Sequence, residues 1–226
     1  MRIFLTGDTH IPIDLEKLAQ NHFKEQKELT KEDYVIVLGD FGLYWHDNDA
    51  FKMWQSWLQK CPFTTLWLDG NHENFDWINS MPVEDWNGGK VNVDGSIIHL
   101  RRGELYDIGG KKFFVCGGAA SYDKVFRRPF VSWWPQEELS AADISHVRDT
   151  LARCQHIDYI LTHTAPASVV KQMFDISTDT AHEEFFQSLL QEEPKVAGVE
   201  WYFGHWHEDK TYRTFHCLYN KIVELK

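Results

Sequence analysis

Short apolar runs, each followed by Gly, Asp or His, constrain the fold of this chain more than any other feature. The runs are rich in β-branched and aromatic residues and do not alternate with polar ones, which is typical of strands covered on both faces. We expect strands at Arg2–Thr6, Tyr34–Leu38, Thr64–Leu68, Phe113–Cys116, Tyr159–Thr162 and Trp201–Phe203. Helical patterns lie between several of these runs, and this alternation favours an α/β layered fold.

Apolar residues recur at helical spacing in four segments. In the first of them, Leu15, Leu18 and Ala19 lie at i, i+3 and i+4. Asp14 stands just before them, where a helix N-cap is expected. The expected helices are Asp14–Leu29, Asp49–Gln59, Gln136–Arg153 and Ala181–Gln191.

Two further regions contain strands so close together that hairpins are expected. They are Ile97–Ile108 and Thr211–Leu225, with turn signals at Arg102-Gly103, Gly109-Gly110 and Tyr219-Asn220-Lys221. We therefore expect mixed sheets, with two sheets packed face to face and helices outside. Residues 117–135 show no regular pattern, and they agree equally well with a functional loop and with a surface loop pinned by aromatic side chains.

Length and composition exclude several classes of protein. The 226 residues suffice for one large core and are short for two full domains, so we expect a single domain over residues 1–226. A net charge of -11 repels phosphate backbones and argues against an extended nucleic-acid surface. No apolar segment approaches the roughly 18 residues of a membrane span, and the first residues do not resemble a signal peptide.

The four cysteines include no C-x-x-C pair, which indicates buried free thiols rather than disulfides or a zinc site. We expect a cytoplasmic protein with no membrane partner, and the sequence leaves its oligomeric state open.

Polar side chains with metal-binding chemistry follow the expected strands. Because ligands bind at the carboxyl ends of the strands in an α/β sheet, side chains placed there converge on one edge. Asp8 and His10 are two residues apart, as are His205 and His207, and extended backbone points both members of such a pair the same way. The side chains that we expect to converge are Asp8, His10, Asp40, Asn71, His163, His205 and His207, with His72 beside them.

The chemistry of this set predicts a centre of two divalent transition-metal ions. Imidazole nitrogens and carboxylate oxygens suit manganese, zinc, iron or nickel, whereas a thiolate site would require cysteine. Asp40 can bridge both ions because a carboxylate offers two oxygens, and Asn71 is a neutral oxygen ligand. With only Asp8 and Asp40 anionic, the loaded centre stays positive and attracts phosphate to an acidic protein. The ions would polarise phosphoryl oxygens and lower the pKa of a bound water.

The chain resembles the calcineurin-like metallophosphoesterase superfamily in five ordered motifs: Asp8-x-His10, Gly39-Asp40, Gly70-Asn71-His72-Glu73, Thr162-His163 and Gly204-His205-x-His207. The resemblance extends from residue 8 to residue 207 and implies a four-layer α/β/β/α sandwich with two packed mixed β-sheets. It implies one metal held by Asp8, His10 and His207. The other metal would be held by Asn71, His163 and His205, with Asp40 bridging the two. His72 would contact substrate and protonate the leaving oxygen.

The chain departs from this pattern after the second motif. Gly39-Asp40 continues into Phe41-Gly42-Leu43, whereas protein Ser/Thr phosphatases continue into Asp-Arg-Gly. This difference puts a protein-phosphatase assignment in doubt.

We therefore predict an enzyme that hydrolyses the phosphate ester of a small substrate by attack of a metal-bound hydroxide. A phosphodiesterase or nuclease with the same ligands is one alternative, and a non-catalytic scaffold of the same fold is another. A scaffold would be expected to lose ligands, and every expected position is filled. Arg127 and Arg128 are candidates for phosphate binding, although two arginines on an exposed loop are usually solvated. We expect Glu73 to cap a helix that begins near Asn74.

Overall fold

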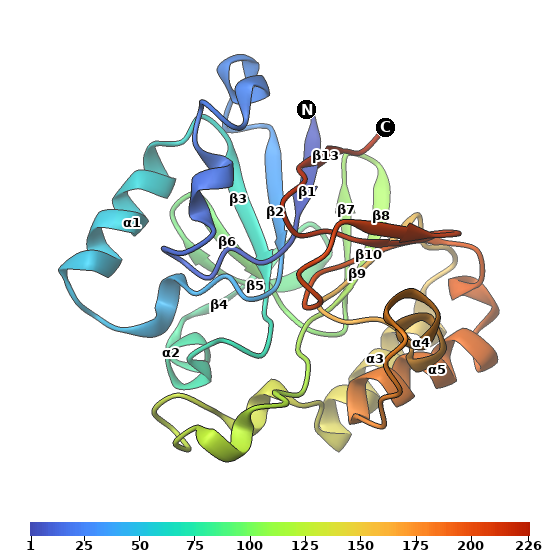
Figure 1. Cartoon of the computed structure of the whole chain (residues 1–226). Helices are drawn as coiled ribbons and strands as arrows, with labels where there is room; N and C mark the ends of the chain where they lie inside the picture. The colour runs from blue at the N-terminus through green and yellow to red at the C-terminus, as the bar shows by residue number, and fades with distance from the viewer.

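Two mixed β-sheets form the centre of the molecule in the computed structural model, which describes residues 1–226 (Figure 1). The first sheet has seven strands in the order β13-β1-β2-β3-β6-β5-β4, and the second has six in the order β11-β12-β10-β9-β8-β7. The strands of the first sheet are β1 (Ile3–Thr6), β2 (Tyr34–Leu38), β3 (Thr64–Leu68), β4 (Val83–Trp86), β5 (Gly89–Asp94), β6 (Ile97–Leu100) and β13 (Val223–Glu224). Those of the second are β7 (Glu104–Ile108), β8 (Lys111–Cys116), β9 (Tyr159–Thr162), β10 (Glu200–Phe203), β11 (Lys210–Tyr212) and β12 (Phe215–Cys217).

Each sheet has a parallel centre and antiparallel edges. In the first sheet β1, β2, β3 and β6 run parallel, and in the second β8, β9, β10 and β12 do. β1, β2 and β3 are buried along almost their whole length, as strands covered on both faces are expected to be. All six predicted strands are present, with ends that differ by at most two residues.

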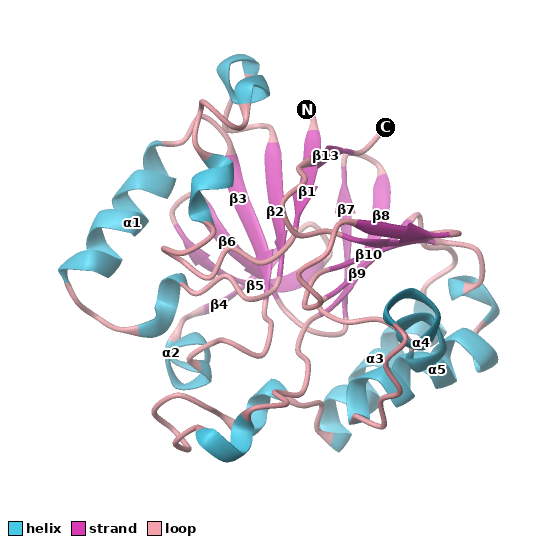
Figure 2. Cartoon of the chain, viewed as in Figure 1, coloured by secondary structure: helices cyan, strands magenta, loops and turns pink.

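Helices cover the two outer sides of the paired sheets (Figure 2). The first sheet carries α1 (Asp49–Lys60) and α2 (Phe75–Ser80), and the second carries α3 (Ala141–Arg153), α4 (Ala167–Phe174) and α5 (Ala181–Glu192). Three buried apolar clusters lie between these layers: one between the sheets and one under each helical layer. The fold is therefore the α/β/β/α sandwich that the sequence predicts.

Side-chain caps set the first residues of α1, α2 and α3. Asn48 accepts a hydrogen bond from the Phe51 N–H at the start of α1, and Ser140 and Asp143 form a capping box at the start of α3. The predicted helix Gln136–Arg153 therefore begins five residues later than expected. The helix expected to begin near Asn74 is α2, whereas α4 was not predicted because it is too short to show a full apolar period.

The predicted helix Asp14–Leu29 is wrong. Two short 3-10 helices occupy this segment, η1 (Leu15–Leu18) and η2 (Lys24–Glu28). Asp14 does not cap the first of them, because its carboxylate faces His10 Nδ1 at 2.7 Å and accepts from the Tyr219 hydroxyl at 3.1 Å. Long-range contacts have overridden the helical periodicity.

The predicted hairpins are correct only in part. Gly109-Gly110 joins β7 to β8, and β11 pairs with β12, as expected. The turns at Arg102-Gly103 and Tyr219-Asn220-Lys221 instead carry the chain from one sheet to the other. An unpredicted hairpin joins β4 to β5 through Asn87-Gly88, where φ is 49° and 94°, as a type I′ turn requires.

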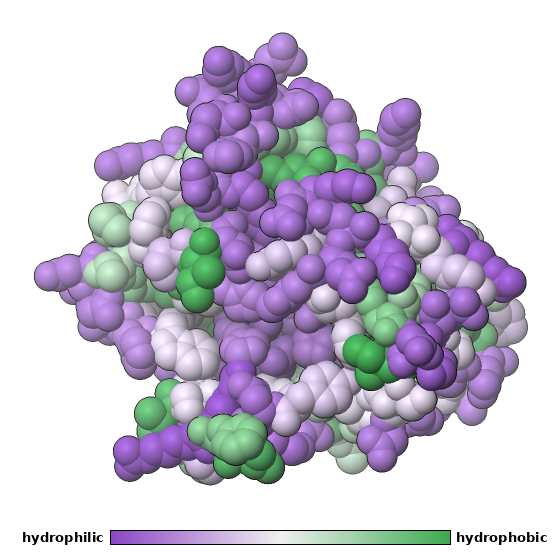
Figure 3. Space-filling view, viewed as in Figure 1, coloured by the Kyte–Doolittle hydropathy of each residue, from purple (hydrophilic) through white to green (hydrophobic).

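The irregular segment 117–138 runs below α2 in Figure 1. It contains two 3-10 turns, η4 (Lys124–Phe126) and η5 (Pro135–Glu137). Its ends are buried and its tip is exposed, with Val125 78% and Phe126 90% accessible. Apolar side chains gather at the lower edge of the mostly hydrophilic face in Figure 3, on the side where this segment runs in Figure 1.

All four cysteines are buried free thiols, as predicted. None of the helices has both the length and the apolar character that crossing a membrane would require.

Candidate metal centre

Side chains from both sheets meet at the carboxyl ends of the central strands. β1 and β2 lead to Asp8 and Asp40, and β9 and β10 lead to His163 and His207. One ligand atom from each of Asp8, His10 and His207 lies within 4.8 Å of the others. The same holds for Asp8, Asp40 and His163. Residues far apart in sequence therefore form two adjoining groups that share the Asp8 carboxylate.

The Asp40 carboxylate lies between two sets of ligands. Its Oδ2 is 3.2 Å from His10 Nε2 and its Oδ1 is 3.3 Å from His163 Nε2. His163 Nε2 is also 3.1 Å from Asn71 Oδ1. The His163 and His205 ring centroids are 5.1 Å apart. Each oxygen of Asp40 therefore faces a different half of the predicted ligand set.

The backbone is strained at several of these positions. A left-handed conformation costs a non-glycine residue about 1–3 kcal/mol and persists only where its surroundings fix it. The site residues with positive φ are His10 (36°), Asp40 (46°), His205 (69°) and His207 (49°). Sharp turns at the strand ends thus aim these side chains at one another.

Two motif glycines allow the carboxylates to approach the turns closely. A Cβ at Gly70 would lie 2.1 Å from Asp40 Oδ1, and one at Gly204 would lie 2.2 Å from Asp8 Oδ1. Any side chain at either position would displace a carboxylate from the centre. The glycines of the Gly-Asn-His and Gly-His motifs are therefore steric requirements of this site.

Hydrogen bonds fix which imidazole nitrogen faces the centre. His163 Nδ1 donates to the Leu38 carbonyl at 2.7 Å, and His10 Nδ1 lies 2.7 Å from the Asp14 carboxylate. Because a carbonyl or a carboxylate accepts the hydrogen bond from Nδ1, Nε2 is the nitrogen that could bind a cation. Such outer contacts are typical of metal-binding histidines.

The buried carboxylates of the cluster are stabilised by positive charge close to them. Burial opposes ionisation of Asp40, yet the neighbouring His163 and His10 hold its pKa well below the usual range. Burial likewise opposes protonation of His163, but Asp40 raises its pKa to about 10. Asp8 Oδ2 is buried without a hydrogen-bond donor, 3.1 Å from His207 Nε2. Buried carboxylate oxygens facing imidazole Nε2 atoms are a donor set that fits divalent cations.

His72 lies beside the cluster and outside both ligand groups. Its backbone N–H donates to Asp40 Oδ1 at 2.7 Å, and its Nε2 accepts a hydrogen bond from Arg127 Nη2 at 2.7 Å. Burial and then the Arg127 charge lower the pKa of His72, against the opposing effect of Asp40. Arg127 is thus at the site, where it also pairs with Asp123 at 2.8 Å. Arg128 is exposed and its side chain does not reach the site.

Asn71 is oriented by residues that the sequence did not suggest. Its Nδ2 donates to Ser121 Oγ at 3.0 Å, and Ser121 Oγ donates to Glu137 Oε2 at 2.8 Å. The Ser121 N–H donates to Glu137 Oε1 at 2.7 Å. Because the Ser121 hydroxyl donates its hydrogen bond to the Glu137 carboxylate, Ser121 Oγ can only accept a hydrogen bond from Asn71. The Asn71 carbonyl oxygen is therefore the atom turned toward His163.

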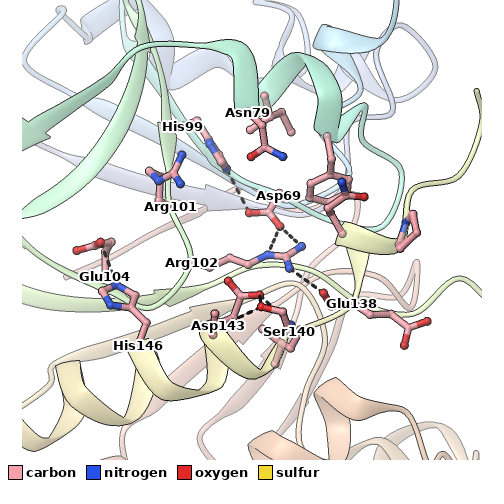
Figure 4. A pocket seen from close by; sticks show the side chains of 16 residues that line it. Asp69, Asn79, His99, Arg101, Arg102, Glu104, Glu138, Ser140, Asp143 and His146 are labelled. Carbon is pink, nitrogen blue, oxygen red and sulfur yellow. Dashed lines mark hydrogen bonds and ion pairs between the residues drawn. The ribbon is translucent and has the colours of Figure 1, made fainter. Parts of the chain in front are cut away.

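Glu137 is itself held in place through an ion pair between Arg102 and Asp69. This pair lies at the wall of a cavity of about 610 Å³. Arg102 donates to Asp69 Oδ2 at 2.6 Å and to the carbonyl oxygens of Glu137 and Glu138 at 3.1 and 3.3 Å. Figure 4 shows Arg102 between Asp69 and Glu138. The segment that carries Glu137 is thus tied to the residue that precedes the Gly70-Asn71 turn.

Glu73 does not cap a helix, contrary to the sequence prediction. Asn74 caps α2 by accepting from the Trp77 N–H, whereas Glu73 is buried and accepts from the Phe41 N–H at 2.7 Å. Burial, reinforced by Asp40, raises the pKa of Glu73 to about 8. This carboxyl group holds the backbone just after Asp40.

Comparison with known proteins agrees with this geometry. The sequence profile of the calcineurin-like phosphoesterase family matches residues 1–209. A lariat debranching enzyme of Schizosaccharomyces pombe is 22% identical over 184 residues, which cover 73% of this chain and 38% of that protein. Lariat debranching enzyme A of Xenopus laevis is 28% identical over 101 residues, 38% of this chain and 18% of that protein.

The chain thus spans less than two fifths of the length of these curated relatives. Because the family profile covers every motif of the centre, the chain belongs to the calcineurin-like phosphoesterase family.

Proposed function

We propose that this enzyme hydrolyses the phosphate ester of a small molecule at a centre of two divalent transition-metal ions. The position of Asp40 carries the proposal, because its two oxygens face two different groups of ligands. Asp8, His10 and His207 would hold one ion, and Asn71, His163 and His205 the other, with Asp40 shared between them. When bound, the ions supply Lewis acidity toward phosphoryl oxygens and lower the pKa of a bound water.

Arg127 would bind the phosphate, and His72 would donate a proton to the leaving oxygen. In the free enzyme the Arg127 guanidinium donates to His72 Nε2, so this nitrogen carries no proton. A phosphate oxygen is a stronger acceptor for a guanidinium than a neutral imidazole is. Substrate would therefore draw Arg127 away and free His72 Nε2 to take up a proton. Arg127 and His72 would thus exchange partners when substrate binds.

The test combines metal analysis with a substrate panel. Purified protein reconstituted with manganese, zinc, iron or nickel should bind about two ions per chain, and chelation should abolish hydrolysis of monoesters. The His163→Ala variant should lose one ion, whereas His22→Ala, at an exposed histidine that pairs with Glu16 and with no residue of the centre, should keep both. Stable binding of less than one ion with full activity would contradict the two-metal proposal.

A phosphodiester is the second candidate substrate, and the similarity to lariat debranching enzymes favours it. The net charge of -11 disfavours a long polyanion. The panel therefore includes small diesters, nucleotides and phosphopeptides beside the monoesters. A kcat/KM for a diester above that for its matched monoester would move the assignment to a phosphodiesterase. We also infer a cytoplasmic location, because four buried free thiols suit a reducing compartment.

A further inference from the structure

An apolar cavity of about 350 Å³ adjoins the candidate metal centre. Three segments form it: the turn after β1, the residues after Asp40, and the first turns of α1. His10 and His72 line this cavity and also stand at the metal centre. Their ring centroids are 5.6 Å apart. The cavity and the centre therefore share a wall.

Apart from His46 and Asn48, the rest of the lining is apolar. Ile11 and Ile13 come from the turn after β1, and Leu43, Trp45, Phe51 and Trp54 come from the opposite side. No Lys, Arg, Asp or Glu lines the cavity, and its polar side chains are His10, His46, Asn48 and His72. A second phosphate or an ammonium group would find no counter-charge there. A sugar would lose hydration of its hydroxyls with few partners to replace it.

The position of His72, the proposed proton donor, indicates which part of the substrate the cavity could hold. A proton donor must lie within hydrogen-bond reach of the leaving oxygen, so the alcohol portion of the ester extends from the phosphate past His72. The cavity lined by His72 is the space on that side of the centre.

We propose that this cavity binds the alcohol portion of the substrate and that this portion carries a flat, uncharged apolar ring. The inference rests on the proposed function and adds the substrate class. Ring-on-ring contact with Trp54 and Trp45 would favour a planar group over an aliphatic one of similar size.

The test compares esters of three primary alcohols, whose leaving oxygens have similar basicity: ethyl phosphate, benzyl phosphate and glucose 6-phosphate. Burying a phenyl ring in an apolar cavity should raise kcat/KM for benzyl phosphate by about 10–100-fold over ethyl phosphate. Glucose 6-phosphate should be the poorest of the three. Benzylphosphonate should bind the metal-loaded enzyme more tightly than methylphosphonate in calorimetry, and this comparison needs no turnover.

Two variants and a control test whether the preference for benzyl over ethyl phosphate arises in this cavity. Trp54→Ala removes a ring from the wall, and Ile13→Ser changes a side chain that is 79% exposed, so the second variant should fold normally. Both should bring the benzyl-to-ethyl ratio toward one. Trp57→Ala, on the same helix but outside the cavity, should leave the ratio at the wild-type value.

Equal kcat/KM for benzyl and ethyl phosphate, or a preference for glucose 6-phosphate, would overturn the assignment of the cavity and leave the phosphoesterase proposal intact. A benzyl-to-ethyl ratio of kcat/KM that stays at the wild-type value in both cavity variants would also overturn the assignment of the cavity. An enzyme that hydrolyses none of the three esters would contradict the proposed function, and the phosphonate pair would then decide the cavity by itself.

Discussion

Ser121→Ala should weaken the binding of one of the two metal ions and leave the other unchanged. The change removes the acceptor for Asn71 Nδ2, which lies 3.0 Å from Ser121 Oγ in a buried environment. An amide N–H group left without a partner in such a place costs about 1–3 kcal/mol. The Asn71 amide is then free to rotate away from the geometry that points its oxygen toward His163.

The magnitude follows from that cost. About 1–3 kcal/mol corresponds to a change in affinity of roughly 5- to 150-fold. Loss of an outer partner of a metal ligand typically costs about 10–100-fold, which lies in the same range. We therefore expect one binding step to weaken by about 10–100-fold. Calorimetric titration of the metal-free protein with manganese, fitted for two equivalents, measures it.

A double-mutant cycle separates positioning from a general loss of stability. If Ser121 acts only through Asn71, then Asn71→Ala and the double variant Asn71→Ala/Ser121→Ala should bind metal equally well. Ser80→Ala removes an exposed hydroxyl hydrogen bond at the end of α2 and should have no effect on metal binding. Ser121→Ala weakening metal binding by the same factor in the presence and absence of Asn71 would refute the reasoning.

Three further predictions address other parts of the molecule. Asp40→Asn should cost more metal than any other single ligand change, because one carboxylate serves both ions; retention of both ions by this variant, with one lost from His163→Ala, would refute the bridge. His72→Asn should keep both ions and lower turnover of alkyl esters by about 10²–10⁴-fold, with a small loss on p-nitrophenyl esters, and equal losses would indicate a binding role. Burial opposes ionisation of Asp33, but two backbone N–H donors lower its pKa, so its stabilising effect is complete above the unfolded pKa of about 3.9 and disappears as the pH falls through the folded pKa. Asp33→Asn should thus destabilise the protein at pH 7 and not in strong acid, as measured by urea unfolding across pH; a difference independent of pH would contradict the linkage.

The parts of the fold that the sequence predicts are those fixed by short stretches of chain. A continuous apolar run specifies a doubly covered strand locally, so β2, β3 and β9 have the expected residues at both ends. Parallel strands place their carboxyl ends at one edge of a sheet, which predicts that the side chains after β1 and β2 meet. Asp8 also meets His207, which follows β10 of the other sheet, because the two sheets pack with these edges together.

The parts that the sequence does not predict depend on partners brought together only by the fold. A turn such as Arg102-Gly103 reverses the chain, but the turn residues do not decide which sheet the next strand joins. Asn71 is held through Ser121, 50 positions further along the chain in the irregular residues 117–135, and through Glu137, 66 positions further along at the start of the predicted helix Gln136–Arg153. Neither the irregular residues nor the helical pattern signals these contacts.

The same irregular segment links three parts of the proposed site. Ser121 orients the proposed ligand Asn71, Arg127 contacts His72, and Trp134 packs edge to face against Trp45 of the apolar cavity, with ring centroids 5.4 Å apart. Its anchors are buried, since Trp134 is 3% exposed and Glu137 is fully buried, whereas its tip is open to solvent. A segment tied down at these anchors can hold a metal ligand in place and still leave Arg127 free to exchange His72 for a phosphate. The anchoring of Asn71 is thus compatible with a change of partner at Arg127, because the hydrogen bonds that hold Asn71 lie in the buried ends of the loop.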